Sequence, residues 1–120
     1  MSEDPHLENK HPEVESLNYD MICRLERRRL GIGDDDIAWE ESGLAGYGAD
    51  QRAVRVYRAP DDQFLVCYEA LCKPSDWETT EPFALITRQQ FDDVPDDPYN
   101  AQATHRAFLE AADMIREEWA

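Results

Sequence analysis

The chain has 120 residues, the length of one domain, and 42% of them are hydrophobic, which is enough to form a core. Asp and Glu number 27 against 12 Lys and Arg, so the formal net charge is -15. This charge argues against direct binding to nucleic acids or membranes, whose anionic surfaces attract basic proteins. The sequence shows no signal-peptide pattern and no apolar run of the roughly 18 residues that cross a membrane. We therefore expect a soluble, cytoplasmic protein.

The first element in chain order is a helix. Residues 1–11 are polar and aperiodic, so we expect a flexible arm there and a single domain over residues 12–120. Pro12 suits a first helical turn, and Gly31 and Gly33 should end the helix. The arginines at positions 27–29 suit the last turn, because the helix dipole favours cations there. The predicted apolar face consists of Val14, Leu17, Met21, Ile22 and Leu25.

Four segments have the composition of strands. A short alternating stretch covers residues 37–40. Residues 53–58 and 64–68 are rich in β-branched and aromatic residues, and a Pro/Asp connector separates them, which predicts an antiparallel hairpin. In the first of these strands, Val54 and Val56 should face one side and Arg55 and Tyr57 the other. Residues 83–86 should form a further strand.

Two further helices are expected near the C-terminus. Thr87 and Gln90 have the spacing of a capping box, which should start a short helix. Asp97 followed by Pro98 should begin the last helix, with Asp97 as its N-cap. The apolar stripe of that helix is predicted to be Phe108, Ala112, Ile115 and Trp119.

These elements predict an α+β fold: a small antiparallel sheet of three to four strands, with an N-terminal and a C-terminal amphipathic helix packed on one face. The strands and helices alternate with polar loops over residues 42–50 and 72–82. The predicted core comprises Val54, Val56, Phe64, Val66, Leu85, Phe108, Ile115 and Trp119.

No cofactor, metal site or catalytic site is expected. The three glycines of residues 42–50 lack the lysine that a phosphate-binding Walker loop needs. Cys23, Cys67 and Cys72 form no Cys-x-x-Cys pair, and His105 is the one histidine outside the N-terminal arm. Reduced thiols packed as small hydrophobic groups are the simpler interpretation. Without a convergent nucleophile, base and orienting group, we expect a protein that is not an enzyme.

The acidity belongs to the body of the chain. Residues 1–31 have a net charge of -2, residues 32–71 of -6 and residues 72–120 of -7. Helix dipoles and turn propensities explain some of the acids near the C-terminus without any partner. We predict that they also form a charged face for a partner, with Trp77 as an apolar anchor, because aromatic residues concentrate binding energy. The predicted partner-binding residues are Asp92, Asp93, Asp96, Asp97, Asp113, Glu117 and Trp77.

Two functional hypotheses fit this charge. In the first, the carboxylates imitate the phosphates of a nucleic acid and occupy the basic groove of a nucleic-acid-binding protein. Inhibitors of nucleases, restriction enzymes or CRISPR effectors, and immunity proteins for nuclease toxins, resemble this chain in size and charge alone. In the second, the charge adapts the surface to a high-salt cytoplasm without mimicry, in keeping with only two lysines, Lys10 and Lys73.

Overall fold

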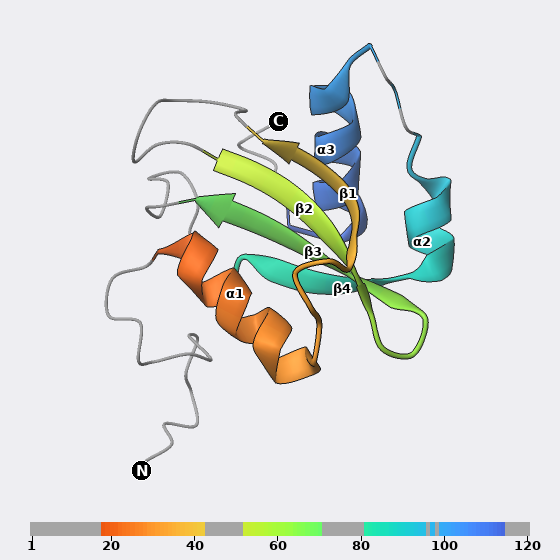
Figure 1. Ribbon diagram of the computed structural model, residues 1–120. Coiled ribbons are helices and arrows are strands. Elements are labelled where there is room, and N and C mark those ends of the chain that lie inside the picture. Colours follow the sequence, from red (N-terminus) through yellow and green to blue (C-terminus); the bar gives the residue numbers. More distant parts are fainter. Residues whose placement is uncertain (1–17, 43–51, 71–80, 96, 98, 115–120) are drawn as a thin grey trace.

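The structure is a computed structural model that describes residues 18–42, 52–70, 81–95, 97 and 99–114. Figure 1 shows an antiparallel sheet in the order β1-β2-β3-β4, accompanied by helices, which is the predicted α+β fold. In chain order the elements are α1 (Tyr19–Leu30), β1 (Ile37–Ser42), β2 (Arg52–Ala59), β3 (Gln63–Ala70), β4 (Phe83–Thr87), α2 (Arg88–Asp93) and α3 (Ala101–Ala111).

Strands β2 and β3 form the predicted antiparallel hairpin, which lies at the centre of the sheet. Val56 pairs with Val66, and Ala59 pairs with Gln63 where the chain turns. Asp61 and Asp62 form the turn with φ of 64° and 60°. Aspartate tolerates this left-handed region better than most residues, so two successive aspartates suit this tight connection.

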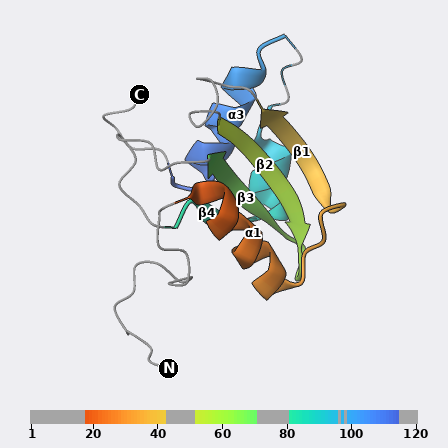
Figure 2. The same ribbon diagram turned by 60° about the vertical axis from the view of Figure 1, so that its left-hand side comes forward.

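The helices cover both faces of the sheet, so the prediction that they pack on one face is not confirmed. Figures 1 and 2 place α1 on one face and α2 and α3 on the other. Side chains alternate along β3: Glu69 contacts Arg27 of α1, whereas Phe64 stacks on Phe91 of α2. Both faces of β3 are buried, one under each helical layer.

Helix α1 begins at Tyr19, whereas the sequence predicted a helix with Pro12 in its first turn. Pro12, Val14 and Leu17 of that prediction lie outside the described residues. The side chain of Asn18 accepts a hydrogen bond from the backbone N–H of Met21 and so caps the helix there. Gly31 ends the helix as predicted, with φ of 75°. Ile22 is buried, but Met21 is 42% exposed, so the buried face is rotated from the predicted one.

The start of α2 is confirmed, and the predicted start of α3 is wrong. Thr87 and Gln90 form the reciprocal capping box at α2. Asn100 caps α3, because its side chain accepts from the N–H of Ala103. Asp97 instead accepts from the N–H of Tyr99 outside the helix, while its own N–H binds Thr104. A nearer side-chain acceptor therefore replaces Asp97 as the N-cap.

The core is largely the predicted one. Leu85 is 42% exposed, which contradicts its predicted place in the core, because it lies on an edge strand while α1 packs mainly over β3. Under α2 and α3, ring contacts connect Phe64, Phe91, Phe108 and Trp39. Ile115, Trp119 and the N-terminal arm lie outside the described residues. The buried predicted residues are Val54, Val56, Phe64, Val66 and Phe108.

Among the described helices, none is long and apolar enough to cross a membrane.

Candidate interaction surfaces

Glu69 of β3 is a buried carboxylate held between two arginines. It is 3% exposed, and it lies on the face of the sheet that α1 covers. Its Oε2 accepts from Nη1 of Arg27 at 3.0 Å and from the hydroxyl of Tyr57 at 3.2 Å, and its Oε1 accepts from Arg55. Arg55 also donates to Glu40 at 2.9 Å, so the network reaches strand β1. These contacts connect α1 to the three strands β1, β2 and β3.

Burial shifts the pKa values of two groups in this network, Glu69 and Tyr57. Burial raises the pKa of Glu69 above its ordinary value, and the charges of Arg55 and Arg27 oppose that rise. Burial also raises the pKa of Tyr57, and the carboxylate of Glu69 raises it further. The guanidinium of Arg27 lies 4.4 Å from the centre of the Tyr57 ring, a cation–π contact that holds both side chains in place.

A groove of about 530 Å³ opens beside this network. Its arginines come from α1 and β2, and its apolar wall comes from Ile32 in the connection after α1 and from Ile37 at the start of β1. Four arginines against three acids give the lining a net charge of +1, opposite in sign to the -15 of the chain. We call this the arginine groove, and its lining is Asp20, Arg24, Arg27, Arg28, Ile32, Asp34, Ile37, Arg55, Tyr57 and Glu69.

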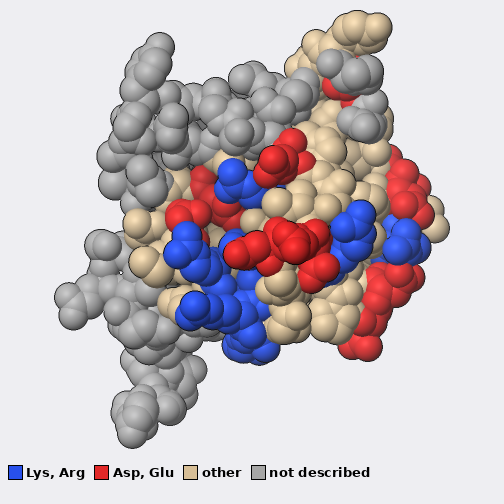
Figure 3. Space-filling view, in the orientation of Figure 1, with Lys and Arg blue, Asp and Glu red and all other residues tan. Residues whose placement is uncertain are grey.

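A separate acidic surface lies where the hairpin turn meets α2. Arg88 at the start of α2 donates to Asp62 at 2.7 Å, which brings the two segments together. Figure 3 shows Asp and Glu along the right-hand edge, over α2 and the hairpin turn, and much of the Lys and Arg surface over α1. We define the acidic surface as the exposed side chains of Asp61, Asp62, Asp92 and Asp93 around Arg88.

The structure places four of the predicted partner-binding residues on the exterior. Asp92, Asp93, Asp97 and Asp113 are exposed. Asp92 and Asp93 belong to the acidic surface, whereas Asp97 precedes α3 and Asp113 follows it. Asp96, Glu117 and Trp77 lie outside the described residues.

Asp61 and Asp62 were not predicted to belong to this surface. Their turn-forming sequence was evident, but their closeness to α2 depends on the contact with Arg88, which lies 26 residues further along the chain. The arginine groove was also missed as a site. The available signal was Glu69, a single acid directly after a run of mainly apolar strand residues, since a buried carboxylate requires cationic partners.

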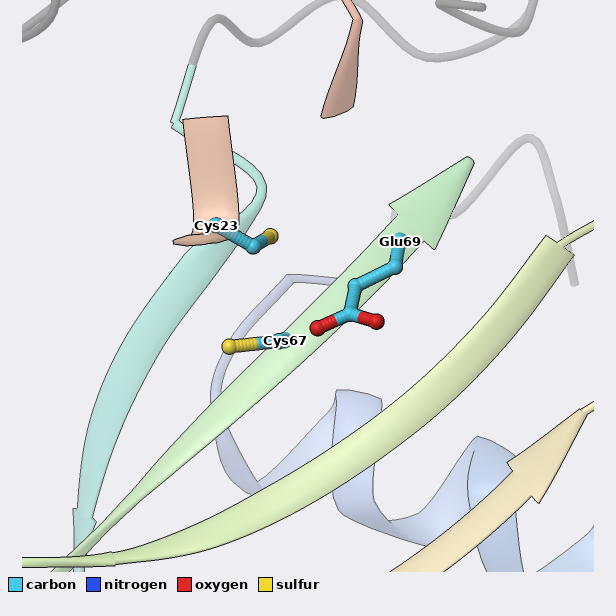
Figure 4. A group of neighbouring side chains, drawn as sticks. All are labelled: Cys23, Cys67 and Glu69. Carbon is cyan, nitrogen blue, oxygen red and sulfur yellow. The ribbon is translucent and has the colours of Figure 1, made fainter. Parts of the chain in front are cut away.

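Cys23, Cys67 and Glu69 form a buried group that could be mistaken for a metal site. Their ligand atoms all lie within 4.8 Å of one another, with Cys67 and Glu69 on β3 and Cys23 on α1 (Figure 4). The thiol of Cys23 faces the backbone oxygens of Pro82 at 3.5 Å and Tyr68 at 3.7 Å, and both Glu69 oxygens already accept hydrogen bonds.

The chemistry of these donors does not suit a metal ion. Burial raises the pKa of Cys23 well above its ordinary value, and the neighbouring Cys67 adds to the rise, so the thiolate form that binds metals is disfavoured. Two guanidiniums beside the group would also repel a cation.

Comparison of the chain with family models, with curated proteins and with solved structures gives no match.

Proposed function

We propose that this chain is a non-enzymatic binding domain whose acidic surface docks on the basic groove of a nucleic-acid-binding protein and so excludes the nucleic acid. The observation that carries the proposal is the uneven use of charge. Arginines pair with acids mainly around α1 and the sheet. In the acidic surface, Asp61 and Asp93 have no ion-pair partner among the described residues, and the same holds for Asp97 and Asp113 near the ends of α3.

The arrangement of the acidic surface also supports the proposal, because two elements bring its four aspartates together. The hairpin turn and α2 present aspartates in two adjacent pairs, Asp61 with Asp62 and Asp92 with Asp93. Duplex DNA carries about one negative charge per 1.7 Å of its axis, and proteins bind it through clusters of Lys and Arg. Closely spaced carboxylates on a folded surface can meet the same cations and steer rapid association.

The test is displacement of a labelled DNA duplex from a restriction endonuclease, a CRISPR effector nuclease and a non-specific DNase. We expect the chain to displace DNA from at least one of them, with an association rate that falls steeply as salt rises, because exposed charges are screened within about 8 Å at physiological salt. Failure to displace DNA from all three enzymes at low salt would contradict the proposal.

A matched pair of variants locates the binding surface. Asp92→Asn with Asp93→Asn should slow association several-fold, whereas Asp35→Asn with Asp36→Asn changes the net charge equally at a different place and should leave the rate nearly unchanged. Asn retains a side-chain oxygen, so the existing hydrogen bonds can persist in both variants. Asp93 accepts from the side-chain amide of Gln89, and Asp36 accepts from the N–H of Gly33. Equal slowing by both variants would show that net charge, and not the acidic surface, governs association.

A further inference from the structure

The arginine groove holds more hydrogen-bond donors than the protein satisfies. Each of its four guanidiniums carries five N–H groups. Hydrogen bonds between described residues use two of these groups on Arg27 and two on Arg55. Arg28 is exposed and has no ion-pair partner among the described residues. The groove therefore presents unused donors on several guanidiniums that converge on one space.

Arg27 is the fixed donor of the groove. The residue is 8% exposed, and its Nε has no hydrogen-bond partner in the part of the chain that the structure describes. Glu69 and the ring of Tyr57 hold its guanidinium in place. A buried cation that is held in position before the ligand arrives loses little conformational entropy on binding.

Asp34 marks the position that an anion could take. Its Oδ1 lies 3.4 Å from Nη2 of Arg27, a long contact, while its side chain is 92% exposed. An exposed carboxylate at this distance contributes little to stability, and an incoming anion can displace it. Arg28, on the next position of α1, lines the same groove.

We propose that the arginine groove binds a small molecule through a phosphate group, with the phosphate on Arg27 and Arg28 in place of Asp34. A phosphate offers three charged acceptor oxygens, which match a site with several unused guanidinium donors better than one planar carboxylate does. Ile32 and Ile37 supply an apolar wall for the rest of the molecule.

Size and charge favour a small ligand over a nucleic acid. The volume of about 530 Å³ lies within the range of small-molecule pockets. A nucleic acid would extend beyond the groove over a protein of net charge -15, which repels it. This site shares no residue with the acidic surface, so the two proposals can fail independently.

The experiment is a titration of the full chain with inorganic phosphate and with pyrophosphate. Binding is detected by calorimetry and by the NMR signals of the arginine Nε–H groups. We expect both ions to bind, with pyrophosphate tighter, and to shift the signals of Arg27 and Arg28. Succinate is the carboxylate control, and a DNA duplex is the polyanion control. Succinate binding as tightly as pyrophosphate, or DNA binding more tightly, would overturn the assignment.

Three variants separate this site from general charge effects. Arg28→Gln should weaken pyrophosphate binding about tenfold, the usual effect of losing one charge-assisted contact. Asp34→Asn should strengthen binding several-fold, because it removes the competing carboxylate. Arg106→Gln on α3 removes the same charge as Arg28→Gln away from the groove and should change nothing. Absence of binding at millimolar pyrophosphate, equal weakening by both arginine variants, or no gain from Asp34→Asn would refute the proposal.

Discussion

Replacing Glu69 by Gln tests whether the buried ionic network stabilises the fold. The variant removes the negative charge of Glu69, with which both Arg27 and Arg55 form salt bridges. Two largely buried guanidiniums then lose this partner. Breaking a buried ion pair from one side costs about 3–5 kcal/mol. Arg55 keeps Glu40, and Arg27 keeps its long contact with Asp34. We therefore expect a loss at the lower end of that range, about 3 kcal/mol, which is a large part of a small domain's stability.

Urea unfolding followed by circular dichroism measures this loss. With a typical slope of about 1–3 kcal/mol per molar urea, the midpoint should fall by about 1–3 M. Glu110→Gln is the matched control, because Glu110 is 57% exposed and pairs with Arg106 across one helical turn. It should cost less than about 0.5 kcal/mol.

Two results would refute this reasoning. A loss below about 1 kcal/mol for Glu69→Gln would mean that burial has already neutralised the carboxyl at neutral pH, so that the amide replaces an uncharged group. A double-mutant cycle with Arg27→Ala measures the pair directly, and we expect a coupling energy of about 1–3 kcal/mol. A coupling near zero would show that Arg27 and Glu69 do not stabilise each other.

The remaining predictions concern pH and salt. Burial raises the pKa of Cys23 above its ordinary 9.0 and the pKa values of Tyr19 and Tyr57 above their ordinary 10.0, so the folded chain keeps protons that the unfolded chain loses. The stabilisation is complete below about pH 9 and is lost as the pH rises, so the melting temperature should fall between about pH 9 and 11. A constant melting temperature over that interval would contradict the burial of these groups. In KCl, we expect the chain to stay folded when the salt is lowered from molar concentrations to about 0.1 M. A steep loss of stability there would favour the salt-adaptation hypothesis, because poor screening of surface repulsion is what destabilises salt-adapted proteins.

Local signals in the sequence predicted the elements well. The hairpin, its connector and the capping box at α2 depend on residues within a few positions of one another, and all three are confirmed. The predicted starts of α1 and α3 were wrong, because Asn18 caps α1 after the predicted first turn at Pro12, and Asn100 caps α3 in place of Asp97. The segments before these two helices each contain several residues that can start a helix, and local preference alone does not select between them.

Long-range placement was harder to predict. The sequence gives the amphipathic face of each helix but not the face of the sheet that each helix covers, so α1 and α3 were assigned to the same side. Leu85 was placed in the core for the same reason, since its burial depends on which strand lies under α1. The arginine groove joins α1 with β2 and β3, and a pattern within one element cannot indicate such a site.

The two helical layers are attached to the sheet by different combinations of forces. Helix α1 buries Tyr19, Ile22 and Cys23 and adds the salt bridges and hydrogen bonds around Glu69. Helices α2 and α3 are attached mainly by the stacked rings of Phe64, Phe91 and Phe108. Hydrophobic contacts weaken on cooling, whereas ion pairs do not depend on the hydrophobic effect. Cold should therefore loosen α2 and α3 before α1, so the ring contacts are the weak point of this fold on cooling.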